Sequence, residues 1–366
     1  MISLKQKFLH FTDSWVDIPV VGFDISDRTI KYLQFVRKPA LGSVIFGEIE
    51  LPEGVIDRGD IIQEEALVSL LKNWLRREGR AFRDSAFAVS LPEEKGFLRL
   101  IQVPKVKKDD IAQTVRWEIE TNVPLPLDQL IYDYEIADSE NKMDHLDVLT
   151  VAYPKTVIES YLRVLKGSRL NPLALEHEAQ SVTRVVLQEN QSTEPMLILD
   201  FGQTRTGIMI ISGGEIVFTT TIELGGKILE ENIERELKVE KSKAIEFKET
   251  VGLNKKFADG KLFAALTPAI SVLSDELKRA IEYYQTHSHH LHSSNLDIKE
   301  LFLAGGDSNL LGLDTYLAAI LKIPVTRAEV PIIKKLWTDH GHIPYIPKSK
   351  LNSYAAAMGL AMKSWE

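Results

Sequence analysis

The sequence has no cysteine among its 366 residues. This absence excludes disulfides, thiolate metal sites and cysteine nucleophiles, and it favours a reducing compartment, for which the cytoplasm is the default expectation. No run of about 18 apolar residues is present either. The beginning of the chain lacks a short apolar segment followed by a small-residue cleavage site. We therefore expect neither a transmembrane segment nor a secretion signal.

Positive charge is also not in excess. The net charge is -8 at pH 7, with 26% charged residues, which provides no basic face of the kind that nucleic-acid binding requires. We therefore expect no nucleic-acid partner. The length of the chain and its 44% hydrophobic residues are sufficient for two domains with ordinary buried cores.

Residues 1–16 are predicted to form a short amphipathic helix. Their apolar residues recur at spacings of four, three and four, and they are Leu4, Phe8, Phe11 and Trp15. The apolar face of this helix either packs on the domain or docks on a membrane surface or a partner helix. Since Lys5 and Lys7 are its only cations, membrane binding by this helix alone would be weak.

Two segments of the chain repeat one pattern. "VVGFDISDRTIKYLQFV" and "MLILDFGQTRTGIMIIS" both read as an apolar strand, an aspartate, a small polar turn and a second apolar strand. Further runs at 43–51 and 85–91 read as strands, the first completing an antiparallel meander. The repeat predicts two related domains that face each other across a cleft.

Other segments surround this repeat. Residues 93–167 read as a compact α+β insertion, with strands at 97–103, 131–137 and 146–154 and helices at 107–123 and 156–168. After the second repeat, helices are predicted at 227–238, 241–252 and 266–288, followed by a strand at 296–306 and a helix at 311–322. The alternating charges of residues 231–249 indicate solvated helical faces. Residues 354–363 form a final helix of small residues that can approach another element closely.

The turns of the repeat suit phosphate chemistry. A small polar turn leaves backbone N–H groups free to face an anion. An aspartate at the end of the preceding strand can hold a hydrated Mg²⁺ that bridges phosphate oxygens. One such turn is more simply a solvent-exposed hairpin. Three turns of this kind, at 24–31, 200–206 and 304–313, together favour a nucleotide site.

These segments resemble the actin-like ATPase superfamily and, within it, the PilM family of type IV pilus assembly proteins, which is related to the cell-division protein FtsA. "GFDISDRTIK" is similar to the first phosphate loop, "DFGQTRT" to the second and "GGDSNLLGL" to the adenosine loop; "IELGG" and "YAAAMGLAM" are similar to further family segments. The middle segment, "LRLIQVPKVKKDDIAQTVRWEIETNVPLPLDQLIYDYEI", is similar to the part that separates PilM from other actin-like proteins. The resemblance covers nearly the whole chain.

The resemblance implies an α/β fold of the bilobed actin-like type, which is a duplicated ribonuclease-H-like ATPase fold, with an FtsA/PilM-type inserted α+β subdomain. It also implies a division into subdomains. These are subdomain 1A at 17–92 and 168–192, the inserted subdomain 1C for partner docking at 93–167, subdomain 2A at 193–228 and 296–366, and subdomain 2B at 229–295.

The family's site residues carry over to matching positions. ATP is expected at Asp24, Ser26, Asp27, Thr29, Lys31, Asp200, Gly202, Gln203, Thr204, Thr206, Gly225, Gly226, Gly305, Gly306, Asp307 and Ser308. Mg²⁺ is expected at Asp200 through water, with Asp24 as a second carboxylate. These two cofactors, ATP and Mg²⁺, are implied by the resemblance.

Some positions depart from the family pattern. Ser26 stands where the family has glycine, and Asp27 repels phosphate unless a metal or Arg28 offsets its charge. Gln203 and Arg205 are larger than usual, and Asp307 replaces a common glycine. We therefore expect weak or degenerate ATP binding. No residue can be chosen as a catalytic base, so hydrolysis has no support and the protein is not expected to be an enzyme.

The resemblance implies a scaffold or adaptor of type IV pilus assembly. Such a protein lies at the cytoplasmic face of the inner membrane and docks the N-terminal tail of a PilN-like membrane protein in a groove that involves the inserted subdomain. Other pilus platform components and self-association are further expected contacts. Two alternatives stay open: an ATPase or sugar-kinase-type enzyme on the same fold, and the cytoplasmic module of a type II secretion platform. Chains of the latter usually continue into a transmembrane helix, whereas this one ends at Glu366.

Two further clusters allow two interpretations each. The histidines of "HSHHLHSS" are His287, His289, His290 and His292, and we expect a solvated loop rather than a zinc site because cysteines and an acid pair are missing. Trp117, Tyr132 and Tyr134 form either an aromatic peptide groove or a core cluster.

Overall fold

The computed structural model describes residues 19–35, 44–78, 81–82, 84–137, 145–187, 194–287, 296–327 and 346–365. The helix predicted for residues 1–16 lies outside these ranges. Within them, no helix is both long enough and apolar enough to cross a membrane.

The first half of the fold is built on a five-stranded sheet with the order β10-β6-β1-β2-β3. Strands β1 (Val20–Ile25), β2 (Thr29–Phe35) and β3 (Val44–Glu50) pair antiparallel, which confirms the predicted meander. Strands β6 (Ala86–Leu91) and β10 (Pro172–His177) continue the sheet in parallel with β1. β1 and β6 are entirely buried, as expected for central strands covered on both faces.

The second half repeats this arrangement in a sheet with the order β13-β12-β11-β14-β15. Strands β11 (Met196–Phe201), β12 (Thr206–Ser212) and β13 (Glu215–Ile222) form the meander. Strands β14 (Leu301–Ala304) and β15 (Val325–Arg327) run parallel to β11. The predicted internal repeat is therefore confirmed, and it places Asp24 and Asp200 at equivalent strand ends. The strand predicted at 296–306 is shorter than expected.

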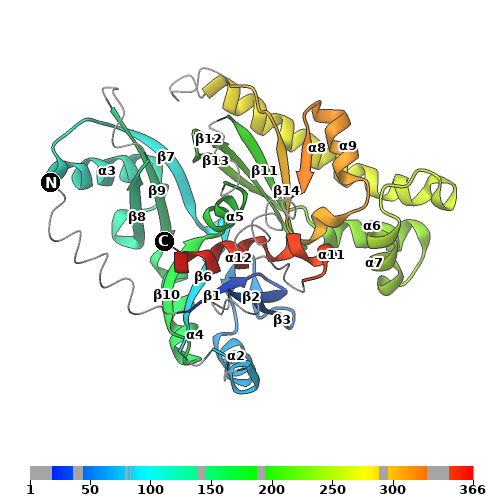
Figure 1. Ribbon diagram of the computed structural model, residues 1–366, viewed down its shortest axis with the longest axis horizontal. Coiled ribbons are helices and arrows are strands. Elements are labelled where there is room, and N and C mark those ends of the chain that lie inside the picture. Colours follow the sequence, from blue (N-terminus) through cyan, green and yellow to red (C-terminus); the bar gives the residue numbers. More distant parts are fainter. Residues whose placement is uncertain are drawn as a thin grey trace.

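Helices cover both sheets (Figure 1). The first half carries α2 (Glu64–Glu78), α4 (Lys155–Gly167) and α5 (Glu178–Leu187). The second half carries α6 (Gly226–Leu237), α7 (Lys241–Thr250), α8 (Lys261–His287) and α9 (Leu313–Leu321). α8 begins five residues before the predicted residue 266, and Pro268 lies inside it.

The final helix, α12 (Ala355–Ala361), packs against β1 and α5. A Cβ on Gly22 of β1 would overlap the carbonyl of Ala357, and one on Gly359 would overlap the carbonyl of Ser181 in α5. The backbones therefore meet where no side chain fits, which confirms the close approach predicted for this helix of small residues. Short pieces precede and follow it: α11 (Lys348–Leu351), η5 (Asn352–Tyr354) and η6 (Met362–Trp365).

Residues 93–154 form a unit inserted in the first half, between β6 and β10, with its own sheet, order β7-β9-β8, at the upper left of Figure 1. It consists of η1 (Glu93–Lys95), β7 (Phe97–Pro104), α3 (Lys108–Asn122), η2 (Leu127–Gln129), β8 (Leu130–Ile136) and β9 (His145–Pro154). Ile111, Val115 and Ile119 of α3 pack on one face of the sheet, and Leu98 and Leu149 join the core beneath α5. The exact subdomain boundaries stay a prediction.

Four short elements remain in the described part of the chain. They are β4 (Ile56–Asp57), β5 (Asp60–Ile61), η3 (Phe257–Gly260) and η4 (Gly306–Asn309). η4 follows β14 directly, so the predicted adenosine loop is a short 3₁₀ turn at the end of a buried strand.

Candidate functional site

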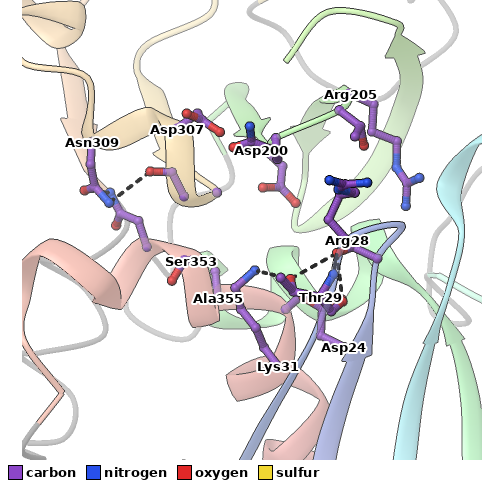
Figure 2. A pocket seen from close by; sticks show the side chains of 18 of the residues that line it. Asp24, Arg28, Thr29, Lys31, Asp200, Arg205, Asp307, Asn309, Ser353 and Ala355 are labelled. Carbon is purple, nitrogen blue, oxygen red and sulfur yellow. Dashed lines mark hydrogen bonds between the residues drawn. The ribbon is translucent and has the colours of Figure 1, made fainter. Parts of the chain in front are cut away.

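A cavity of about 980 Å³ lies between the two halves, where the β1–β2 turn, the β11–β12 turn and the β14–η4 turn converge (Figure 2). Residues of α5, α6, α7 and α12 complete its wall. Most of the residues predicted from the three loops line it. They are Asp24, Ser26, Thr29, Lys31, Asp200, Gly202, Gln203, Thr204, Gly305, Gly306 and Asp307.

Five predicted residues support the loops from outside the wall: Asp27, Thr206, Gly225, Gly226 and Ser308. Thr206 Oγ1 donates to the carbonyl of Leu224 at 2.5 Å, and Ser308 Oγ donates to that of Gly305 at 2.7 Å. A Cβ on Gly225 would lie 2.5 Å from the carbonyl oxygen of Gln203, and one on Gly226 would overlap the Asp307 carboxylate. The two glycines therefore permit close approach between loops.

The phosphate turns use some of their own backbone donors. Ser26 N donates to the carbonyl of Thr29 at 2.9 Å, and Gly202 N donates to that of Arg205 at 3.0 Å. Lys31 Nζ donates to Thr29 Oγ1 at 3.3 Å, which holds the ammonium beside the first turn. These two amides are therefore not free for an anion, while Lys31 and the Thr29 and Thr204 hydroxyls face the cavity.

Asp24 and Asp200 line the cavity from the first and second strand ends, respectively (Figure 2), and their charges interact. Asp24 Oδ1 accepts a hydrogen bond from Ser90 Oγ at 3.0 Å, and burial raises its pKa while Lys31 opposes the rise. Burial, followed by the negative charge of Asp24, raises the pKa of Asp200 to about 6. Such a carboxylate pair attracts a cation. Because Mg²⁺ prefers octahedral oxygen ligands, water and phosphate have to supply its remaining positions.

Glu93 and Glu178 also line the cavity, and the sequence patterns did not single them out. Glu93 is 7% exposed, its Oε1 has no hydrogen-bond partner, and burial followed by Asp200 raises its pKa to about 8. Burial also raises the pKa of Glu178, opposed by Arg205. Glu93 lies two residues after the buried strand β6, and Asp24 and Asp200 lie near the ends of β1 and β11, so its position was a signal available in the sequence.

The carboxylate of Asp27 lies beside Arg205 rather than Arg28. Its Oδ1 accepts a hydrogen bond from Gly59 N at 3.0 Å and lies 3.6 Å from Arg205 Nη1. Arg28 instead pairs with Glu53 at 3.4 Å. Arg28, one of the two groups named as able to offset this charge, therefore does not lie beside Asp27, whereas Arg205 of the second half does. Its carboxylate is kept out of the cavity wall.

Asp307 belongs to a second buried network. Lys248 Nζ donates to Asp307 Oδ1 and to Glu230 Oε1, both at 2.5 Å, and Gln203 Nε2 donates to Glu230 Oε2 at 3.1 Å. Although burial alone would lower the pKa of Lys248, the Asp307 and Glu230 carboxylates raise it. The prediction of a solvated face over residues 231–249 is thus wrong at Lys248, which is 8% exposed.

The three aromatic residues singled out in the inserted unit lie in different environments. Trp117 on α3 is 59% exposed, whereas Tyr132 and Tyr134 pack against the core of the unit. They do not form one cluster. His287 ends α8 and stacks on Tyr283 with ring centroids 4.3 Å apart, while the other three histidines lie outside the described ranges. Those ranges contain no group of three or more histidine, aspartate or glutamate side chains arranged to hold a metal.

Comparison with known proteins gives both a family and a fold. The family described as type IV pilus assembly protein PilM matches residues 22–365. A solved PilM-PilN type IV pilus biogenesis complex is similar with a TM-score of 0.77 and 22% identity, over 96% of this chain and 100% of that one.

Two other structures share the fold. The ethanolamine utilization protein EutJ from Carboxydothermus hydrogenoformans has a TM-score of 0.55 and 16% identity, over 98% of this chain and 97% of that one. MreB 5 of Spiroplasma citri bound to AMPPNP has a TM-score of 0.53 and 13% identity, over 87% and 96%. These similarities confirm the predicted actin-like fold. The match over almost the entire length shows that the chain belongs to the family of the type IV pilus assembly protein PilM.

Proposed function

We propose that this protein is an actin-like adaptor of type IV pilus assembly, which binds the N-terminal tail of a PilN-like inner-membrane protein from the cytoplasmic side. The observation that carries this proposal is the family match over residues 22–365. The similarity to a PilM-PilN complex, covering 100% of that chain, supports the choice of partner.

The inserted unit provides surfaces for such a tail. β8 is the last strand in the order β7-β9-β8, so one of its sides has no strand neighbour within the described ranges. Ile131 at its start is 43% exposed, and Trp117 on α3 is 59% exposed. An extended peptide can add to a free strand edge through main-chain hydrogen bonds while apolar anchors give specificity. We place the docking site on this unit.

We further propose that the cavity binds ATP with Mg²⁺ weakly. Asp200 and Asp24 would hold the hydrated metal, Lys31 with Thr29 and Thr204 would face the phosphates, and the β14–η4 turn would receive the nucleoside. A bound Mg²⁺ supplies positive charge that offsets the carboxylates. The binding is weak because the Ser26 and Gly202 amides are used within their turns and are not available to phosphate.

Titration of the purified protein with a synthetic N-terminal peptide of the organism's own PilN-like protein tests the partner. Ile131→Asp is expected to abolish binding, because it places a charge in the apolar contact. Val272→Asp is the matched control, since Val272 is 51% exposed on α8, away from the inserted unit. Equal loss in both variants, or unchanged binding in Ile131→Asp, would reject this docking site.

Calorimetric titration with ATP and Mg²⁺ tests the cavity, with Asp200→Ala as the variant that removes the metal-binding carboxylate. Binding that disappears in the variant supports the nucleotide site. No heat and no thermal shift at millimolar ATP would mean that the three turns are part of the fold but do not bind nucleotide.

Hydrolysis is a second candidate function, and the carboxyl groups of Glu93 and Glu178 at the cavity wall favour it. A carboxylate with a raised pKa is a stronger proton acceptor than an ordinary one once it is deprotonated. Release of inorganic phosphate, compared between the natural chain and Glu178→Gln, tests this alternative. Phosphate release by the natural chain that is lost in the variant would support hydrolysis. No phosphate release by the natural chain would reject hydrolysis and leave the adaptor role as the proposed function.

A further inference from the structure

One side chain crosses between the two halves beside the cavity. Arg205, in the β11–β12 turn, donates from Nη1 to Glu94 Oε1 at 2.6 Å and lies 3.6 Å from Asp27 Oδ1. Its Nη2 lies 3.6 Å from Glu178 Oε2. The three carboxylates come from η1, the β1–β2 turn and the start of α5, all in the first half. The guanidinium of this one residue in the second half therefore lies beside three acidic side chains of the first half.

The environment makes these contacts strong. The Arg205 side chain is 14% exposed, and charge interactions are screened less there than at the surface. The planar fork of arginine can serve several carboxylates at once, which a lysine ammonium cannot do with the same geometry. Removing the guanidinium would leave three neighbouring carboxylates uncompensated, and these would repel one another.

Other groups of the two halves also lie close together near Arg205. Thr204 Oγ1 lies 3.5 Å from Asp27 Oδ2, and a Cβ on Gly207 of β12 would overlap the Glu93 carboxylate. The η1 turn of the first half thus packs directly against a strand of the second half.

We propose that Arg205 is a clasp that holds the two halves closed around the cavity before any ligand enters. Closure is then a property of the polypeptide, and a nucleotide is not needed to join the halves. The shape presented to a partner stays the same with and without nucleotide, which suits a permanent adaptor. Only this last consequence rests on the proposed function; the clasp itself does not.

A second ion pair between the halves provides a matched control. Arg58, between β4 and β5, lies 3.4 Å from Glu223, which follows β13. Their side chains are 69% and 76% exposed, so this pair contributes little to closure. Arg58→Gln and Arg205→Gln therefore remove the same group from the same interface in two different environments.

Because the chain has no cysteine, two introduced cysteines accept spin labels without background. Lys72→Cys on α2 and Lys256→Cys after α7 are both exposed and lie on opposite halves. Pulsed electron paramagnetic resonance then measures the distance distribution across the cavity in the full chain without ligand. We expect one narrow population in the natural background and in Arg58→Gln, and an additional, longer population in Arg205→Gln.

Glu94→Gln keeps the arginine but weakens its shortest contact. The longer-distance population is therefore expected to be smaller in this variant than in Arg205→Gln. This variant replaces Arg205→Gln in the test if Arg205→Gln does not fold. An unchanged distribution in both cluster variants would overturn the clasp, as would equal widening in Arg58→Gln. Parallel titration with ATP and Mg²⁺ separates the two proposals. If the distance distribution widens in Arg205→Gln and the natural chain gives no heat of ATP binding, the clasp is retained and the nucleotide site is rejected.

Discussion

Lys248 Nζ lies 2.5 Å from Asp307 Oδ1, and both side chains are 8% exposed. This contact joins α7 to the β14–η4 turn, and Glu230 of α6 shares the same ammonium. The aspartate that replaces a glycine of the family pattern is therefore matched by a cation from a helix that follows the second sheet's meander. The substitution is part of a network rather than an isolated negative charge in the cavity.

Replacing Lys248 with methionine is expected to reduce the free energy of unfolding by about 3–5 kcal/mol, because it leaves two buried carboxylates unpaired. Lys243→Met on the same helix is the control. Lys243 pairs with Glu246 at the surface, where such pairs contribute less than about 1 kcal/mol. Urea unfolding measures both. Similar small losses in the two variants would show that the network does not contribute to stability.

The buried Glu93 predicts a pH dependence. The folded state holds a proton on this carboxyl up to about pH 8, whereas the unfolded chain releases it near pH 4.5, so the folded state binds more protons between these values. Stability therefore falls as pH rises through this window. Glu93→Gln removes this effect and is expected to raise the free energy of unfolding by about 2–4 kcal/mol at pH 8, with little change at pH 5.

Unfolding measured at both pH values checks this expectation. Glu65→Gln on α2 is the control, because Glu65 is exposed and its replacement is expected to change stability little at either pH. A Glu93→Gln variant with the same pH slope as the natural chain would contradict the buried, protonated state.

Lys31 provides a prediction for the nucleotide site. Hydrogen bonds to charged groups contribute about 1.5–3 kcal/mol, so Lys31→Met is expected to weaken ATP binding about 10-fold or more. The exposed Lys72→Met, away from the cavity wall, is expected to bind ATP like the natural chain. Calorimetry compares the two. Equal affinities would show that the phosphates do not lie beside the first turn.

The packing of α12 on β1 predicts a large cost for one methyl group. Gly22→Ala places a Cβ onto the carbonyl of Ala357, which is backbone and cannot move aside easily. A loss of about 3 kcal/mol is expected from such overpacking. Gly167→Ala is the control, since its nearest neighbour is a side-chain methyl of Val68 at 3.2 Å. Thermal unfolding that ranks the two variants equally would contradict the tight contact between β1 and α12.

The local features of this fold were predictable. The strands around Asp24 and Asp200 follow from apolar runs that end at an aspartate and a small polar turn, and both sheets confirm them. The boundaries were less predictable: the strand at 296–306 is confined to Leu301–Ala304, and α8 begins at Lys261. Strand and helix ends depend on contacts with neighbouring elements, which a pattern along the chain does not contain.

The amino-acid sequence by itself determined the elements, the internal repeat and the family, because hydrophobic periodicity and turn residues act over a few neighbouring positions. Only the tertiary structure decided which charges meet. Arg205 and Glu94 are 111 residues apart in the chain, and Lys248 and Asp307 are 59 apart. Neither pair has a local signal, since an ion pair forms wherever folding brings opposite charges together in a buried place. The same reason hid Glu178, whose importance comes from its place beside the Asp24–Asp200 pair.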